Sequence, residues 1–313
     1  MKAGDVLKPP QDVLSVRFFS VGYLPSCGAL LYLLVLVWAG APGPTLRFNT
    51  AWDTATALGA GEVLGILLAV LLVALLLAPL QLPLVRLLEG DWPLGLGTRA
   101  ARLRQLRRKR RLEATRVLAG PTAPTAEEIQ RAGTAASALA RSFPAPDHLV
   151  RPTRLGNVLA AMEDTAGRPY GLDPVVAWPR LYPLLDDKVR AVVDDRRNAL
   201  DAAVRMTATG AVTAVVSTAL LVRSGWWVCL VLLPLAMAVT AYSGAVQSAL
   251  AYGEAVHTAI DLHRFTLLTA LHLPLPSDRT EEQAVNKALS DEWRQNVPFS
   301  PTYRHQSDGG QQP

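Results

Sequence analysis

Four long uncharged, mostly apolar runs constrain this chain more than any other feature of its sequence. The first covers residues 18–46, and its apolar core at 21–41 is long enough to cross a hydrocarbon layer of about 30 Å as a helix. The other three runs cover residues 63–85, 206–222 and 226–253. Runs of this length predict an all-α integral membrane protein with two transmembrane helical hairpins, which makes four spans, and an inserted cytoplasmic helical domain.

The composition agrees with this class and excludes some kinds of chemistry. Of the 313 residues, 50% are hydrophobic and only 18% are charged, a balance too apolar for an ordinary soluble domain. The two cysteines, Cys27 and Cys229, each lie inside an apolar run. Because the chain has no Cys-x-x-Cys pair and no zinc-ligand spacing, we expect no disulfide framework, no metal site and no cofactor.

Basic residues set the orientation of the spans, because Lys and Arg close to span ends mark the cytoplasmic side. Nine of them fall between residues 99 and 116, whereas Arg47 is the only one in the loop that joins the first two spans. We therefore expect a multi-pass protein with its N-terminus, its long middle segment and its C-terminus in the cytoplasm.

A competing interpretation concerns the first run. Ala39-Gly40-Ala41 has the small-x-small form of a signal-peptidase site, and cleavage after Ala41 would leave three spans. The segment before the run is long and the second span follows closely, which favours an uncleaved anchor. With the anchor retained, the chain divides into a cytoplasmic N-terminus (1–20), a first transmembrane hairpin (21–88), a cytoplasmic helical domain with a stalk (89–205), a second transmembrane hairpin (206–253), cytoplasmic amphipathic helices (254–295) and a disordered tail (296–313).

The densest basic segment, called the basic run below, comprises Arg107, Arg108, Lys109, Arg110 and Arg111. Nucleic-acid binding would need interleaved aromatic residues or a recognisable fold, and the segment has neither, so we expect no nucleic-acid partner. Contact with anionic lipid of the inner leaflet is physically reasonable, since each basic residue there contributes on the order of 1 kcal/mol. The run is also the topology signal itself, and these two interpretations are compatible.

The segment from residue 151 to 183 is the most distinctive in the chain. Thr153 has the sequence context of an N-cap, which would put Arg151 and Arg154 beside a helix N-terminus. Backbone N–H groups and the helix dipole favour an anion there, so these three residues are a candidate contact for a phosphate or lipid headgroup. The alternative is a cap with surface salt bridges only, because Gly156-Asn157 lacks the spacing of a phosphate-binding loop.

Two further helix starts are predicted, one before and one after the N-cap at Thr153. Thr125 and Glu128 form the pattern of a capping box, which predicts a helix to about residue 141. Asp173 followed by Pro174 predicts a sharp helix start. Two more prolines before residue 184 should prevent a long helix, because each lacks the backbone N–H and crowds the preceding turn.

If this last helix continues, it presents one apolar and aromatic face. Residues at helical spacing on that face are Trp178, Leu181, Tyr182 and Leu185. The face belongs either in a small core or at the membrane interface, where Trp and Tyr rings are favoured. Tyr170, Trp178 and Tyr182 are therefore candidate interface or docking residues.

Charged residues beyond the proline-rich segment are spaced for helices. Opposite charges recur every four residues from 186 to 205 without a proline, which predicts one continuous stalk leading into the third span and argues against catalytic carboxylates. After the fourth span comes a stripe of Glu254, His257, Asp261 and Arg264. The stripe could contribute to a divalent metal site, but Glu254–His257 and Asp261–Arg264 pairs on a solvated face are the favoured interpretation.

The spans favour close packing over transport. The only ionisable candidate within them is Glu62, at the outer start of the second span, whereas coupled transporters carry ionisable groups inside the membrane. Small residues line one face of the fourth span, at Ala241, Ala245, Ala249 and Gly253. Such a face could pack within the bundle or against another copy, so a homo-oligomer is one of two open interpretations.

Short motifs across residues 150–275 resemble those of a known family. They are PTRLGN at 152–157, YGLD at 170–173, WPRL at 178–181, DLHRF at 261–265 and LHLP at 271–274. Together they resemble a family of uncharacterised bacterial multi-span membrane proteins. The resemblance implies a location in the bacterial cytoplasmic membrane and brings no activity with it. That family has an aromatic residue at the position of His263, which speaks against this histidine as a metal ligand.

We expect a non-enzymatic, membrane-anchored scaffold or signalling component that contacts the lipid bilayer and an unidentified protein partner. An enzyme would need a nucleophile with its base or a set of metal ligands, and neither Ser-His-Asp spacing nor His-Glu-x-x-His occurs, so no catalytic residue is assigned. Two alternatives stay open. One is an oligomeric channel lined by small or polar residues of several copies, and the other is a membrane-bound enzyme with an unrecognised site.

Overall fold

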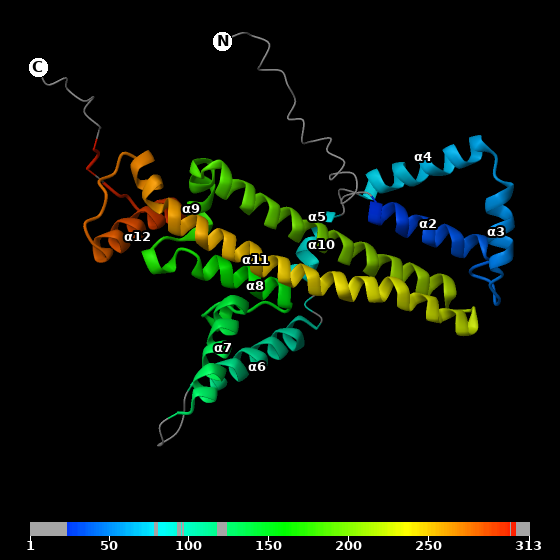
Figure 1. Cartoon of the computed structure of the whole chain (residues 1–313), viewed down its shortest axis with the longest axis horizontal. Coiled ribbons are helices and arrows are strands. Elements are labelled where there is room, and N and C mark those ends of the chain that lie inside the picture. Colours follow the sequence, from blue (N-terminus) through cyan, green and yellow to red (C-terminus); the bar gives the residue numbers. More distant parts are fainter. Residues whose placement is uncertain are drawn as a thin grey trace, which may run out of the picture. The chain divides into compact units, whose positions relative to one another are not determined.

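The computed structural model of the chain describes residues 24–77, 81–92, 95, 97–117, 124–300 and 302–304. All regular secondary structure in these ranges is helical, as predicted (Figure 1). The predicted cytoplasmic N-terminus, 1–20, lies outside the described residues. The chain divides into two compact units, of which unit 1 comprises Met1–Leu87 and Asp201–Ala245, and unit 2 comprises Leu88–Leu200 and Val246–Pro313.

Two helices are long and apolar enough to cross a membrane. One is α10 (Asp187–Leu221), which has 35 residues. The other covers Gly225–Ala270 and consists of a 3-10 helix, η6 (Gly225–Val231), continued by α11 (Leu232–Ala270). Both contain apolar and charged sequence without a break between them, so the predicted continuous helix from the charged segment into the third uncharged run is present as α10. No proline interrupts either charged extension, so the helical hydrogen-bond ladder continues through it.

The N-terminal part of unit 1 contains α2 (Leu24–Trp38), which is apolar but shorter. Next come α3 (Phe48–Ala57) and α4 (Ala60–Leu77), which meet at a bend of 112° and form one broken span or a re-entrant loop. The described residues thus contain two helices able to cross a membrane, or up to three if the bent pair is one span. The sequence predicted only a loop where α3 forms, and the structure divides the uncharged run at 63–85 between α4 and a separate helix, α5 (Gln81–Glu89).

Apolar contacts and two long-range hydrogen bonds hold the described helices of unit 1 together. The apolar cluster consists of Leu36, Ala39, Ala41, Leu46, Ala51 and Leu221. The Tyr32 hydroxyl donates to the Leu230 carbonyl oxygen over 2.9 Å, and the Ser224 hydroxyl donates to the Gly43 carbonyl oxygen over 2.7 Å. These contacts tie α2 and the loop after it to the turn that follows α10.

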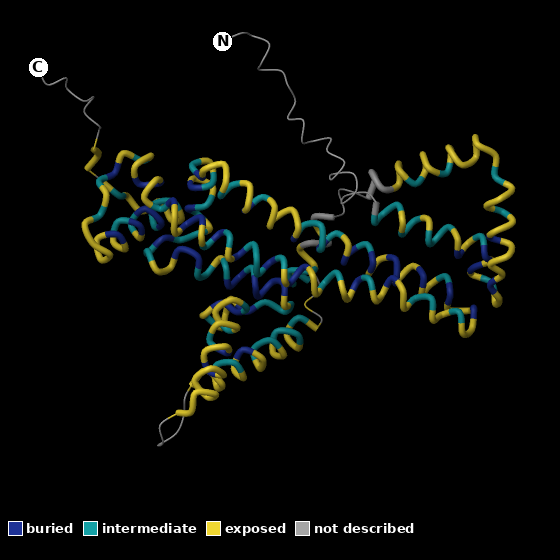
Figure 2. Tube along the Cα trace, viewed as in Figure 1, coloured by how far each residue is buried: buried dark blue, intermediate teal, exposed yellow. Residues whose placement is uncertain are grey.

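Large apolar residues face outward in unit 1, and most of α4 is exposed (Figure 2). Leu64, Val215 and Leu233 are 68%, 70% and 66% exposed. Inside the unit, α10 and α11 approach so closely that a Cβ added to Gly210 would lie 2.9 Å from the Ala238 backbone nitrogen. Leucines on the outside and small residues between helices are typical of helices surrounded by lipid.

Unit 2 combines shorter helices with the charged extensions of α10 and α11. The shorter helices are α6 (Thr98–Arg116), α7 (Ala126–Ser142), α8 (Arg154–Thr165), α9 (Pro174–Leu181) and α12 (Arg279–Gln295), with 3-10 turns η3 (Asp147–Leu149), η4 (Arg168–Tyr170) and η5 (Tyr182–Leu184). Their main core contains Ala166, Leu172, Ala177, Leu181 and Leu185 together with Val193 of α10 and Val256, Ala259, Ile260 and Leu267 of α11. The two long helices thus supply half of this core.

Local sequence signals predicted the helix starts of unit 2. Thr125 and Glu128 form a complete capping box at α7, as predicted. The Thr153 side chain caps α8 and the Asp173 side chain caps α9, which confirms both predicted N-caps. The predicted short helix is also confirmed, because α9 ends at Leu181 and passes into the 3-10 turn η5.

The C-terminal segment keeps contact with unit 2 as far as the structure describes it. Phe299 packs against the cluster of Leu268, Leu273 and Leu289, and the Arg304 backbone N–H donates to the His272 carbonyl oxygen over 2.8 Å. The first part of the predicted disordered tail, 296–313, is therefore packed. Residues 305–313 lie outside the described residues.

Candidate functional site

The distinctive segment at residues 151–157 folds into a locked turn at the start of α8. The Thr153 hydroxyl accepts from the Gly156 backbone N–H over 3.0 Å. The Asn157 side chain accepts from the Arg151 backbone N–H over 2.7 Å and donates to the carbonyl oxygens of Arg151 and Thr153 over 2.9 and 2.7 Å. Asn157 is buried, and these bonds satisfy its amide while they fix the path of the chain.

Gly156 has a second role, which is to let another part of the backbone come close. A Cβ at this position would lie 2.0 Å from the Glu89 carbonyl oxygen, so only glycine fits. The start of α8 is therefore covered by a carbonyl group, whose partial charge is negative. Arg151 forms ion pairs with Glu89 at 3.7 Å and Glu163 at 3.2 Å. Of the three predicted anion contacts, Thr153 and Arg151 thus serve the fold, as the cap and salt-bridge alternative predicted.

Arg154, the third predicted contact, lines a small pocket of about 40 Å³ together with Arg108 of the basic run. Gln105 and Gln247 contribute polar side chains to this pocket, and none of its lining residues is acidic. Partial burial, and after it the positive charge of Arg154, lowers the pKa of the Arg108 guanidinium. The structure therefore brings together one residue from each of two sequence features that were predicted separately.

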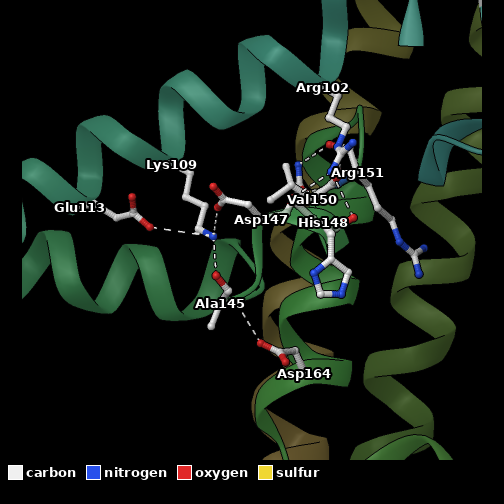
Figure 3. A network of polar contacts seen from close by, with 10 residues as sticks. Arg102, Lys109, Glu113, Ala145, Asp147, His148, Val150, Arg151 and Asp164 are labelled. Atoms are coloured by element: carbon white, nitrogen blue, oxygen red, sulfur yellow. Dashed lines mark hydrogen bonds and ion pairs between the residues drawn. The ribbon is translucent and has the colours of Figure 1, made fainter. Parts of the chain in front are cut away.

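Lys109 departs from its predicted role in the basic run. Its side chain is only 2% exposed, and its Nζ donates to Asp147 Oδ1 and to the Ala145 carbonyl oxygen, each over 2.6 Å (Figure 3). Glu113 lies 3.9 Å away. The hydrogen bond from Lys109 is the largest of the effects that lower the pKa of Asp147. Lys109 is therefore a buried tie between α6 and the loop after α7, and not a lipid contact.

The other members of the basic run, Arg107, Arg108, Arg110 and Arg111, are exposed. The reason for the difference lies in helix geometry, because neighbouring residues point about 100° apart and only one of the five faces α7. Arg102, seven residues before Lys109, also reaches the loop after α7 and donates to the carbonyl oxygens of Val150 and Asp147 over 3.0 and 2.9 Å (Figure 3).

The three candidate interface aromatics pack within unit 2. Trp178 and Tyr182 are partly buried against the main core, with their ring centroids 5.8 Å apart. The Tyr182 hydroxyl donates to Asp194 Oδ1 over 2.7 Å, which is the first cause of its raised pKa. Tyr170 is covered by the guanidinium groups of Arg264 and Arg279, at 4.2 and 5.4 Å from its ring centroid. The structure favours the core interpretation of this face.

The YGLD motif at residues 170–173 packs closely against α12. Gly171 has φ +71°, and a Cβ there would lie 2.6 Å from the Gln283 carbonyl oxygen of α12. Asn286 Nδ2 donates to the Tyr170 carbonyl oxygen over 2.9 Å, and the Asp173 backbone N–H donates to the Ser290 hydroxyl over 3.0 Å. The sequence analysis did not predict this contact between the YGLD motif and α12. The polar residues at helical spacing on α12 could have indicated it.

The Glu254–Arg264 stripe finds partners on other helices. Arg264 donates to the Asp261 backbone carbonyl oxygen, but its ion pair is with Glu282 at 2.7 Å, and Glu254 pairs with Arg141 at 2.9 Å, so the ion pairs of the stripe are made with other helices. His257 Nε2 lies 3.2 Å from Thr165 Oγ1. Among the described residues, no three His, Cys, Asp or Glu side chains come together in a way that could hold a metal ion.

Two larger hollows open on unit 2. A groove of about 580 Å³ runs between α7, α8 and α11, with Met162 and Leu250 on its apolar wall and the Arg141–Glu254 pair at its edge. A cleft of about 560 Å³ lies between α8 and α12, and charged residues line much of it, with Arg294 of α12 paired to Asp173, the N-cap of α9. Both are large enough to receive side chains of a partner.

Comparison of the chain with protein-family models, with curated proteins and with solved structures finds no match. The resemblance carried by the motifs therefore stays a prediction. What the structure adds is a physical role for two of them, since Gly156 and Gly171 each stand where another backbone segment leaves no room for a side chain.

Proposed function

We propose that this chain is a multi-span protein of the bacterial cytoplasmic membrane whose helical cytoplasmic module acts as a non-enzymatic scaffold that docks another protein. The proposal keeps four spans in two hairpins, with both termini and the module in the cytoplasm. It also keeps the resemblance to uncharacterised bacterial multi-span membrane proteins, which assigns no reaction.

The composition of the main core of unit 2 carries this proposal. Val193 of α10 and Ile260 of α11 are 1% and 0% exposed and pack with Leu181 of α9. The helices that supply Val193 and Ile260 also contain the two apolar segments, so the core of the module is built on the same two helices that are apolar enough to cross a membrane. A module built in this way stays at the membrane and presents its hollows there, which suits a scaffold.

An aromatic cluster in unit 1 supports the four-span topology. Phe48 follows the first predicted span, and its ring centroid lies 5.2 Å from that of Trp227, which lies at the start of the fourth. Trp227 in turn stacks on Trp226 at 4.1 Å. Tryptophan gathers at membrane–water interfaces. A cluster that joins the two loops supports their location at the same membrane face, as two hairpins require.

Two pairs of buried alanines support an uncleaved first span and the packing of the fourth span within the chain. Ala39 and Ala41 are buried in a cluster with Leu221, which supports an uncleaved first anchor. Ala245 and Ala249 are both 0% exposed within the single chain. Their burial supports packing of the small-residue face inside the bundle, so contact with a second copy would use another surface.

Photo-crosslinking tests the scaffold. We would place a photoreactive phenylalanine derivative at Val175, which is 51% exposed and lines the cleft between α8 and α12. The control position is Val192, which is 53% exposed on α10 and lines none of the hollows described above. In native membranes, we expect one discrete adduct from position 175, identified by mass spectrometry, and only background from 192. Identical products from both positions would refute docking at this cleft.

Cysteine labelling tests the topology independently. In a background without Cys27 and Cys229, a cysteine would replace Asp53 in α3 or Gly133 in α7, both of which are exposed. An impermeant maleimide should label Asp53→Cys on intact cells and Gly133→Cys only after permeabilisation. Labelling of Gly133→Cys on intact cells would reject the cytoplasmic module.

A further inference from the structure

One face of α6 carries a group of exposed arginines. They are called the arginine face below and comprise Arg99, Arg104, Arg107, Arg110 and Arg111. Within the part of the chain that the structure describes, none of their guanidinium groups forms a hydrogen bond or an ion pair. Glu113, the only acidic residue of α6, lies beside Lys109 instead. The arginine face is therefore a region of unbalanced positive charge, which an anionic partner would fit.

Helix geometry separates the arginine face from the side of α6 that packs within unit 2. Arg102 and Lys109 both reach the loop after α7, so they mark the packed side. Since successive helical residues are rotated by about 100°, Arg107 and Arg111 each point about 160° away from Lys109. The middle of the arginine face therefore points away from the loop after α7.

The position of α6 along α11 places it near the membrane in the proposed topology. Arg108 of α6 lines the small pocket together with Val246 of α11. The fourth uncharged run, 226–253, is longer than the roughly 20 residues that cross the hydrocarbon core, so its last turns reach the inner headgroup layer. Arg141 of α7 pairs with Glu254, the first charged residue after that run. Thus α6 lies beside the last apolar turns of α11, and α7 reaches further, into its charged extension.

The loop after α7 lies further along α11 than α6 does. The Ala145 backbone N–H in this loop donates to Asp164 Oδ2 over 2.8 Å, and the neighbouring Thr165 Oγ1 lies 3.2 Å from Nε2 of His257 in the charged extension of α11. The loop is therefore level with the charged extension, whereas α6 is level with the last apolar turns. Because the middle of the arginine face points away from this loop, it points toward the inner leaflet in the proposed topology.

An exposed leucine lies within the arginine face. Leu103 is one helical turn from both Arg99 and Arg107 and is 54% exposed. Arginines around an apolar side chain suit the boundary between lipid headgroups and acyl chains, where the leucine meets the chains and the guanidinium groups meet phosphates. A nucleic acid is a poorer fit, because α6 has no aromatic residue that could stack on bases. The combination favours a lipid surface as the partner.

We propose that the arginine face of α6 lies against the anionic headgroups of the inner leaflet, with Leu103 between them, and holds the cytoplasmic module at the membrane surface. The inference rests on the proposed topology and goes beyond the scaffold, because it assigns a second surface with a lipid partner. It also changes the predicted lipid contact. Lys109 leaves that contact, because its Nζ is bonded to Asp147, and Arg99 and Arg104 join it.

Quenching of a fluorophore by spin-labelled lipids tests this surface. The full-length chain, without Cys27 and Cys229, carries the fluorophore on Leu103→Cys or, as the control, on Ile129→Cys, which is 52% exposed on α7. It is placed in phosphatidylcholine nanodiscs that contain a small, equal fraction of spin-labelled phosphatidylglycerol or spin-labelled phosphatidylcholine. At Leu103→Cys, phosphatidylglycerol should be preferred about fivefold or more, since each basic residue near the leaflet contributes on the order of 1 kcal/mol. At Ile129→Cys, we expect neither lipid to quench.

Two double variants that each remove two exposed arginines test the role of charge. Arg107→Gln/Arg111→Gln changes the middle of the arginine face and should lower the preference for phosphatidylglycerol at Leu103→Cys about fivefold. Arg131→Gln/Arg141→Gln removes the same charge from α7, where the two side chains are 61% and 62% exposed, and should change the preference less than about twofold. Equal loss in both double variants, or no loss in Arg107→Gln/Arg111→Gln, would overturn the arginine face as the lipid contact.

The label at Leu103→Cys keeps the test informative if a double variant does not fold, because it retains every arginine of α6. Equal quenching by phosphatidylglycerol and phosphatidylcholine would reject an anionic partner. Quenching by neither lipid would reject the membrane contact and assign the face to an acidic protein surface. If neither lipid quenches while Asp53→Cys and Gly133→Cys show the expected maleimide pattern, only the lipid surface fails, so the two proposals can be separated.

Discussion

Val239 and Ile260 lie on the same helix, α11, and their surroundings are opposite. Val239, in unit 1, is 59% exposed, whereas Ile260, in unit 2, is 0% exposed in the main core. The same contrast separates Leu64 of α4 from Leu181 of α9, which are 68% and 0% exposed. Apolar burial drives packing only where the surroundings are water, because lipid is as apolar as leucine. The contrast is what the proposed topology predicts for a helix that passes from lipid into water.

The largest expected effect comes from applying one kind of truncation to both units. Leu181→Ala should destabilise unit 2 by about 2–5 kcal/mol, because it removes a fully buried side chain from the main core. Val239→Ala should change stability by less than about 0.5 kcal/mol, because its side chain is exposed. Denaturant unfolding in detergent, followed by circular dichroism, measures both. A large loss of stability in Val239→Ala would contradict the contrast between the two units.

A smaller effect is expected at the glycine of the PTRLGN motif. Gly156→Ala should cost roughly 1–3 kcal/mol, since the added Cβ meets the Glu89 carbonyl oxygen and backbone cannot move aside cheaply. Gly133→Ala is the control, in the middle of α7 with nothing within 4 Å of the added Cβ, and should stabilise by about 0.5–1 kcal/mol. Thermal unfolding of the two variants should move in opposite directions, and a shared direction would contradict the close contact.

Replacing the buried Lys109 of the basic run should cost more stability than replacing its exposed neighbour Arg110. Lys109→Met should cost about 1–3 kcal/mol at pH 7, because Asp147 and the Ala145 carbonyl oxygen lose a charged donor. Arg110→Met, a change on the exposed side of α6, should stay within about 0.5 kcal/mol. Urea unfolding of both variants measures the difference, and equal costs would contradict the assignment of Lys109 as a buried tie.

The difference in stability between the wild-type chain and Lys109→Met should depend on pH. Since Lys109 lowers the folded pKa of Asp147, the stabilisation is present above the unfolded carboxyl pKa of about 3.9 and is lost as the pH falls through the lower folded value. Unfolding curves of the wild-type chain and Lys109→Met should therefore converge in acid. A gap that stays constant from pH 7 to about pH 3 would exclude the Asp147 contact as its source.

The smallest expected effect is at the edge of the groove beside α11. Arg141→Gln should change the unfolding free energy by no more than about 1 kcal/mol, because the Arg141 and Glu254 side chains are 62% and 57% exposed. Thermal unfolding at low and high salt measures this change. A cost well above about 1 kcal/mol would show that the groove edge is part of the core.

Helix starts and helix continuity could be predicted from sequence because they depend on neighbours in the chain. The capping box of Thr125 and Glu128 needs residues only three positions apart, and the stalk needs only an absence of proline. The helix at 48–57 was missed, because its few apolar residues give no clear period and it packs against a distant segment through Phe48 and Trp227.

The partners of charged residues could not be predicted. The sequence alone paired Arg264 with Asp261, and Arg264 does donate to the Asp261 backbone carbonyl oxygen, but its ion pair is with Glu282 on another helix. Lys109 and Arg110 have the same local context, yet the first is buried with Asp147, 38 residues away. Ion-pair choice depends on which helices meet, and that is fixed by packing of the whole unit.

The amino-acid sequence by itself determined that this chain is helical, where several helices start and that it contains segments apolar enough to cross a membrane. It could do so because capping, proline effects and hydropathy act over a few residues or one helix length. Only the tertiary structure decided that Arg108 and Arg154 line one pocket, that Lys109 pairs with Asp147 and that Arg151 pairs with Glu163. The physical reason is that a charge is satisfied by the groups that packing brings to it, and those groups come from distant parts of the chain.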